Sequence, residues 1–149
     1  MQMIDSIRAT VTVTNGVYTA ADVAGGLITF SNAVREVGGV ALVHSIKLAG
    51  VAAIPYKLWF LNANLVTPRV DNESFNIVVA DEPKILGIVP ITAGDYAAAQ
   101  SAFNVACLRM VGLQVQAAAT TQDIYAYLVC DAVTSPGTTT IYLTVDFIP

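Results

Sequence analysis

The sequence predicts an all-β protein, a single-domain, jelly-roll-like β-sandwich of about eight strands over residues 1–149. A chain of 149 residues has the ordinary size of one domain. Short runs of β-type residues are separated by turn signals at intervals of roughly 8 to 20 residues, as in sandwiches and small barrels. No segment shows the periodicity of a helix of three turns. Eight strands with long crossings favour the jelly roll among these folds.

The first strand is expected over residues 7–14, where apolar and polar side chains alternate as in a half-buried strand. Asn15-Gly16 follows and predicts a turn, because both residues tolerate positive φ. Residues 1–6 are a possible N-terminal arm. The expected strands are 7–14, 27–30, 40–48, 56–61, 85–91, 104–116, 123–130 and 140–148.

Two of these strands carry further expectations. In residues 40–48, Leu42, Ile46 and Leu48 are placed on one face together with His44. Residues 56–61 are apolar on both faces, which fits a central strand covered on both sides or a strand whose outer face meets a neighbour.

The remaining elements are expected as follows. Pro90 favours an edge position for its strand, and residues 95–100 are expected to form a short helical turn. Residues 104–116 form either a strand pair or one long strand, with Gly112 as a possible bend or bulge. Gly25-Gly26 and Gly38-Gly39 are interpreted as turn glycines, since neither continues into a phosphate-binding motif.

The composition indicates burial against other proteins. Charged residues make up 12% of the chain and hydrophobic residues 55%, whereas a typical soluble domain has about 25% charged residues. A transmembrane helix needs about 20 consecutive apolar residues, and no membrane partner is expected because no stretch qualifies. No signal peptide is expected either. Subunit interfaces are depleted in Lys, Glu and Asp, so an assembly subunit is the better interpretation. The most apolar stretch, 40–61, is interrupted by His44, Lys47, Pro55 and Lys57.

The charge distribution argues against nucleic-acid binding. The net charge is −4, and the basic residues form no run along the sequence. Nucleic-acid binding uses clustered Lys and Arg, so we expect no nucleic-acid partner. The seven basic residues are Arg8, Arg35, Lys47, Lys57, Arg69, Lys84 and Arg109.

The metal-ligating residue types are too few for a zinc site. Cys107 and Cys130 are the two cysteines and His44 is the sole histidine, so one chain cannot supply a Cys/His set of four ligands. Each cysteine is interpreted as a small core residue, with a disulfide between them left open. His44 is interpreted as a structural or interface residue.

The carboxylates and serines do not form a recognisable catalytic pattern. Asp71 and Glu73, with Asp81 and Glu82, suggest a calcium site or paired carboxylates, but they lack the ligand spacing of a known loop. A solvated loop and turn is the expected alternative. There is no GxSxG elbow. We therefore expect no enzyme activity, no catalytic residues, no metal and no cofactor.

The aromatic residues allow two interpretations. They could form a stacking platform for sugars, or they could fill the core, where each buries about 150–250 Å². Core positions are favoured, and Trp59 could face a partner subunit. The residues concerned are Tyr56, Trp59, Phe60, Tyr125, Tyr127 and Tyr142.

Four stretches resemble a group of small virion proteins of tailed phages. They begin with residues 17–30, which carry the pattern Y-x-A-x-D-V-x-G-G-L, and continue with residues 39–46, 58–64 and 84–96. Together they span most of residues 10–130 in a consistent order. Some members of this group are similar to capsid decoration, or cement, proteins.

The resemblance implies a function. Decoration proteins are small, β-rich and often trimeric, and they bind across capsomer junctions on the outer capsid surface of the virion. The implied partners are the major capsid protein and further copies of this chain in a homotrimer. The alternative is a carbohydrate-binding or adhesin module of a phage head or tail fibre, suggested by the aromatic residues. Termini and loops are free to reach neighbours, so the expected interface residues are Met1, Ile4, Trp59, Val66, Arg69 and Phe75.

Overall fold

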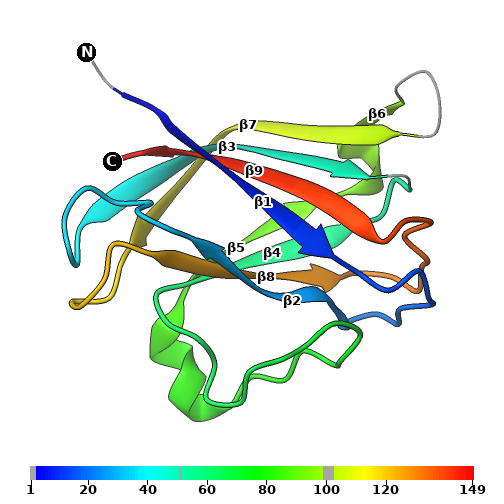
Figure 1. The fold of residues 1–149 in the computed structure, drawn as a ribbon, viewed down its shortest axis with the longest axis horizontal. Coiled ribbons are helices and arrows are strands. Elements are labelled where there is room, and N and C mark those ends of the chain that lie inside the picture. The colour runs from blue at the N-terminus through cyan, green and yellow to red at the C-terminus, as the bar shows by residue number, and fades with distance from the viewer. Residues whose placement is uncertain (1–2, 51, 99–102) are drawn as a thin grey trace.

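Two antiparallel sheets pack face to face in the computed structural model, which describes residues 3–50, 52–98 and 103–149 (Figure 1). The elements, in which η marks a 3₁₀ helix, are β1 (Asp5–Thr12), β2 (Val23–Phe30), β3 (Val40–Gly50), β4 (Tyr56–Leu61), η1 (Val79–Lys84), β5 (Ile85–Ile91), η2 (Ala93–Asp95), β6 (Tyr96–Ala98), β7 (Asn104–Gln116), β8 (Ile124–Cys130) and β9 (Thr140–Ile148).

The strand order is that of a jelly roll. One sheet runs β1-β9-β3-β7-β6 and the other β2-β8-β4-β5. With the short strand β6 set aside, every connection crosses from one sheet to the other, except the connection from β4 to β5. The predicted fold class is therefore confirmed, and β6 adds a short ninth strand at one edge.

The core lies between the two sheets, where the inward side chains of the strands interdigitate. Three fully buried phenylalanines from the two sheets pack against one another within the core. The Phe30 ring on β2 lies 6.1 Å from the Phe60 ring on β4 and 5.5 Å from the Phe147 ring on β9, measured between centroids. The contact with Phe147 is edge to face, a geometry that aromatic pairs prefer.

The alternation expected in the first strand is present. Val11 is buried and Ile7 packs partly buried against the core, while Arg8 and Thr12 are exposed. The strand begins at Asp5, which pairs with Phe147 of β9. Within the possible N-terminal arm, Met3 and Ile4 are therefore the described residues that precede the sheet.

The prediction that Leu42 shares a face with Ile46 and Leu48 is wrong. Against β9, β3 carries one extra residue between Val43 and Ser45, whereas against β7 the extra residues of the register shift lie on β7, between Arg109 and Leu113. A one-residue bulge exchanges the two faces of a strand. Ile46 and Leu48 are buried in the core as a result, whereas Leu42 points outward and is 37% exposed.

The interpretation of Gly25-Gly26 as turn glycines is also wrong. Both lie inside β2, which pairs with β8 on either side of them, and the register shifts between Ala24 and Leu27. Their φ angles of +81° and +80° are accessible to glycine and strained for other residues. The pair therefore forms a bulge in an edge strand and not a turn between strands.

Two further expectations about the strands are confirmed. Residues 104–116 form one long strand, β7, whose register against β3 is interrupted around Gly112, where φ is +71°. Pro90 lies on β5, an edge strand that pairs with β4 alone.

The short helical turn expected at residues 95–100 is wrong over 96–98. A 3₁₀ turn is present at Ala93–Asp95 instead. Residues Tyr96–Ala98 form the strand β6, which pairs with the start of β7. Pairing with a neighbouring strand overrides the helix preference of the alanines. Residues 99–100 lie outside the described residues.

The bulge in β2 yields a stability test. A Cβ at Gly25 would lie 2.2 Å from Val11 Cγ1 and would carry a positive φ. We expect Gly25→Ala to lower the free energy of unfolding by about 2–4 kcal/mol, from overpacking and backbone strain together. Urea unfolding measures this. Gly16→Ala is the matched control, because its nearest neighbour would be 3.8 Å away, and it should change stability by less than about 0.5 kcal/mol.

Candidate protein-docking surface

The connection between β4 and β5, residues 62–84, covers the outer face of the four-stranded sheet, at the bottom of Figure 1. Beneath it lies a second hydrophobic cluster, separate from the main core. Its buried members are Val23, Leu61, Leu65, Tyr127 and Val129. Of the two alternatives for residues 56–61, the structure shows a strand covered on both sides, and the outer cover comes from the chain itself.

The middle of this connection is fixed by the carboxylate of Asp71. It accepts hydrogen bonds from the hydroxyl of buried Tyr18 at 2.7 and 2.8 Å, from the Thr14 amide at 2.8 Å and from the Gly25 amide at 2.6 Å. Burial raises the pKa of Tyr18 to about 12, which keeps its hydroxyl protonated as a donor. Asp71 thereby joins the connection to the β1–β2 turn and to the bulge in β2.

Backbone hydrogen bonds extend this attachment. The amides of Asn72 and Phe75 donate to the carbonyls of Val23 and Ala21, at 2.8 and 2.7 Å. In return the Val23 amide donates to the carbonyl of Glu73 at 2.8 Å. Residues 72–75 are thus held along the start of β2.

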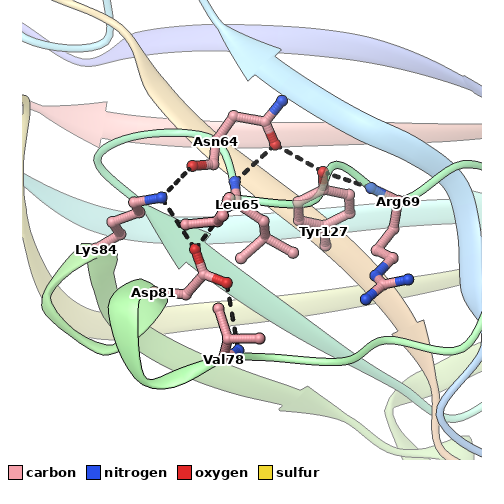
Figure 2. Close-up of polar contacts among 8 residues, drawn as sticks. Asn64, Leu65, Arg69, Val78, Asp81, Lys84 and Tyr127 are labelled. Carbon is pink, nitrogen blue, oxygen red and sulfur yellow. Dashed lines mark hydrogen bonds and ion pairs between the residues drawn. The ribbon is translucent and has the colours of Figure 1, made fainter.

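The two ends of the connection are joined by the buried carboxylate of Asp81 in η1 (Figure 2). It accepts hydrogen bonds from the amides of Val66 at 2.7 Å and Val78 at 3.3 Å, and it pairs with Lys84 Nζ at 2.9 Å. Lys84 also donates to the carbonyl of Asn64 at 2.9 Å. Desolvation opposes ionisation of Asp81, but these donors outweigh it and hold the pKa of the carboxyl below its usual value.

Tyr127 connects this network to the sheet (Figure 2). From β8 its hydroxyl donates to Asn64 Oδ1 at 2.7 Å and accepts the Arg69 amide at 3.3 Å. Asn64 Oδ1 also accepts the Leu65 amide at 2.8 Å. The Asn64 side chain, the Tyr127 hydroxyl and the Leu65 and Arg69 amides are therefore paired with one another, whereas Trp59 Nε1 and Arg69 Nε are buried without a hydrogen-bond partner.

Aromatic packing supports the connection from below. The Phe75 ring lies between Trp59 of β4 and Tyr127 of β8, with centroid separations of 5.0 and 5.5 Å. Trp59 and Phe75 are partly buried. Because the connection is held by two carboxylates and an aromatic cluster, its outward side chains have fixed positions.

Those outward side chains include four exposed valines. The exposed fractions are 57% for Val66, 60% for Val70, 45% for Val78 and 93% for Val79. A valine has few rotamers, so its side chain loses little entropy when a partner covers it. Exposed apolar side chains that gather on one surface mark protein-docking sites, and these four valines all belong to the one connection over the outer face of the sheet. We call Val66, Val70, Val78 and Val79 the exposed valines of the connection.

The expected interface residues fall into three groups. Val66 and Ile4 are exposed, at 57% and 50%. Arg69, Trp59 and Phe75 are partly buried under or within the connection. Met1 lies outside the described residues.

Sequence reasoning did not select Val70, Val78 and Val79. A signal for two of them existed in residues 77–80, an apolar run that belongs to no expected strand.

The carboxylates of Asp71, Glu73 and Asp81 accept hydrogen bonds from backbone amides of their own chain, whereas Glu82 is exposed. The expectation of a solvated loop is wrong for Asp81, which is 1% exposed, since it is surrounded by donors from its own chain. In the described part of the chain, no group of three or more His, Cys, Asp or Glu residues is placed to hold a metal ion.

The two cysteines differ in environment. Cys130 is buried in the main core as expected, whereas Cys107 on β7 is exposed, so its interpretation as a core residue is wrong. The bulge-containing strand β7 places Cys107 on the outer face of its sheet. Both are free thiols, and burial raises the pKa of Cys130 to about 12.

The six aromatic residues do not form one platform. Tyr56, Phe60 and Tyr127 are buried. Trp59 lines a groove of about 400 Å³ together with Phe75, and the ion pair of Lys57 with Asp131, at 2.7 Å, borders it. Trp59 thus combines an accessible groove with nearby charged groups, and Tyr125 lines a second groove of about 380 Å³ with Asn62 and Asn64.

Comparison of the chain with known protein families and with characterised proteins found no match. Among the described residues, no helix is long and apolar enough to cross a membrane.

The lowered pKa of Asp81 predicts an acid dependence of stability. Its ionised form stabilises the fold fully above the ordinary carboxyl pKa of about 3.9, and this contribution is lost as the pH falls through the lower folded value. We expect Asp81→Asn to be less stable at pH 7 and to lose less further stability on acidification. Urea unfolding from about pH 7 to about pH 3 measures both effects.

The control for this experiment is Glu82→Gln, which removes the exposed carboxylate of the residue that follows Asp81. It should keep the stability and the pH dependence of the wild type. An Asp81→Asn curve parallel to that of the wild type at every pH would contradict the role of the carboxylate.

Proposed function

We propose that this protein is a capsid decoration, or cement, protein of a tailed phage. In this role it is a non-enzymatic subunit on the outer surface of the virion that binds the major capsid protein and stabilises the head. The observation that carries the proposal is the set of exposed valines on a connection held rigidly by Asp71 and Asp81. The low content of charged residues and the sequence resemblance support it further.

The jelly roll is compatible with this function without establishing it. The same architecture occurs in viral capsid domains and in lectins, and function depends on the site that a fold carries. The docking surface is therefore the relevant feature. It carries four exposed valines, which cost little entropy to cover, and it lies on one face of the sandwich.

The physical mechanism follows from linked contacts. Internal pressure separates capsomers, and a protein that binds two of them adds contact area across the seam. Once one contact forms, the second occurs at high effective concentration, so weak contacts combine into tight attachment. A homotrimer at a three-fold position would multiply the number of linked contacts.

Replacing two exposed valines tests the proposal. Val66→Ser with Val79→Ser should weaken binding to phage heads prepared without this subunit by roughly tenfold or more, because covered valine surface contributes about 1.5–3 kcal/mol per side chain. Co-sedimentation with the heads measures the affinity.

Val17→Ser with Val133→Ser is the matched control. These two valines are 66% and 70% exposed and lie outside the connection. Its affinity should equal that of the wild type. If wild-type protein does not bind the heads at all, the proposed function is wrong.

A specific observation favours a second candidate function, a carbohydrate-binding or adhesin module. The groove beside Trp59 combines an aromatic wall with Lys57 and Asp131, residue types that stack on sugars and bond their hydroxyls. Glycan-array binding that is lost in Trp59→Ala would support it. Tyr127 is buried and bonded to Asn64, so it is unavailable to a sugar. Silence of the wild type on a broad array would end this candidate.

A further inference from the structure

We propose that the open face of the five-stranded sheet is a second docking surface, and that it binds an acidic surface of a partner protein. This inference deepens the proposed function and rests on it for the identity of the partner. The four-stranded sheet is covered by the 62–84 connection, whereas the outer face of the β1-β9-β3-β7 sheet has no such cover among the described residues (Figure 1). A groove of about 490 Å³ lies on that face.

The strand register brings basic residues together on this face. Arg8, Lys47 and Cys107 lie in one cross-strand row, joined through Thr144, and Arg109 lies in the next row. Neighbouring strands are about 4.8 Å apart. Arg8 on β1 and Lys47 on β3 are therefore separated by roughly 10 Å. Residues far apart in the sequence thus form one basic cluster, and the sole histidine, His44, lines the same groove.

Asp146 is the carboxylate that lines this groove, and its oxygens accept hydrogen bonds from two serine hydroxyl groups. Ser6 and Ser45 both donate hydrogen bonds to it from the neighbouring strands. Burial opposes its ionisation, but these two donors, with His44 and Lys47 nearby, keep the pKa of Asp146 below its usual value. Asp146 therefore stays ionised and contributes one negative charge, against which the three positive charges of Arg8, Lys47 and Arg109 leave the face with a net positive charge.

The basic side chains are not paired with carboxylates of their own chain. In the described part of the chain the ion pairs are Lys57–Asp131 and Lys84–Asp81, neither of which involves this face. Arg8 stacks over the Tyr142 ring, 4.3 Å from its centroid, which holds the guanidinium on the surface. Lys47 and Arg109 are exposed.

Charge complementarity identifies the occupant. The chain has a net charge of −4, yet this face presents three of its seven basic residues around one hydroxyl-bound carboxylate. An acidic protein surface would pair with these charges, which steers association and fixes orientation. The 62–84 connection, which carries the exposed valines, lies on the opposite side of the sandwich (Figure 1). Two docking surfaces on opposite faces would let one molecule contact two neighbours.

The test compares a face variant with a control that changes the net charge equally. Lys47→Gln with Arg109→Gln removes two positive charges from the face, and Arg35→Glu changes the charge by the same two units at an exposed residue elsewhere. Binding is measured by co-sedimentation with heads prepared without this subunit, at low and high salt, and by fluorescence anisotropy with a glutamate-rich peptide. We expect the face variant to lose roughly tenfold in both affinities, together with much of their salt dependence. The control variant should bind as the wild type does.

Several outcomes would overturn the inference. The inference is wrong if the face variant binds heads and peptide with the affinity of the wild type. It is also wrong if the face variant and the control variant lose the same amount of affinity. Loss of self-association alone would assign the face to a second copy, and loss of binding to a DNA duplex alone would assign it to nucleic acid. If wild-type protein does not bind heads, the proposed function fails, and the peptide measurement still decides whether the face recognises acidic chains. Urea unfolding of both variants verifies that they fold.

Discussion

The arrangement of this protein depends on the attachment of the 62–84 connection to the outer face of one sheet. Strands β4 and β8 are apolar on both sides, and an uncovered outer face would expose Tyr127, Val129 and Leu61 to water. Two carboxylates hold the cover in place, Asp71 against β2 and Asp81 against the ends of the connection itself. Their donors are mostly backbone amides, so the attachment fixes the course of the chain as well as its side chains.

This cover makes the two faces of the sandwich different. One face is closed by a connection that carries exposed valines, and the other is an open sheet with basic residues around Asp146. A subunit that joins neighbours needs surfaces of this kind pointing in different directions. An apolar surface contributes affinity through burial, while a charged surface contributes orientation and rate of association.

Much of the fold could be predicted from the sequence, because period-two alternation and turn residues are local signals. The strands at 7–14 and 140–148, the edge position of Pro90 and the irregularity at Gly112 are of this kind. The bulges in β2 and β3 were not predictable, since a bulge depends on the register of the neighbouring strand. That is why Leu42 was placed on the wrong face and why Gly25-Gly26 was interpreted as a turn.

The candidate surfaces could be predicted only in part. The sequence directed attention to residues 62–75 and to Val66, but Asp71 and Asp81 find their donors far along the chain, at Tyr18 and Val66. The basic residues form no run in the sequence, and pairing of β1, β9, β3 and β7 is what gathers Arg8, Lys47 and Arg109. Such clusters arise from register and cannot be read from spacing.

We propose that this protein joins neighbouring subunits through two opposite surfaces. An electron cryo-microscopy map of phage heads carrying the protein, at a resolution that shows side chains, tests it most directly. We expect the exposed valines of the connection and the basic face around Asp146 both to contact neighbouring subunits. A map in which both surfaces face solvent, or in which the protein is absent from the head, would contradict the claim.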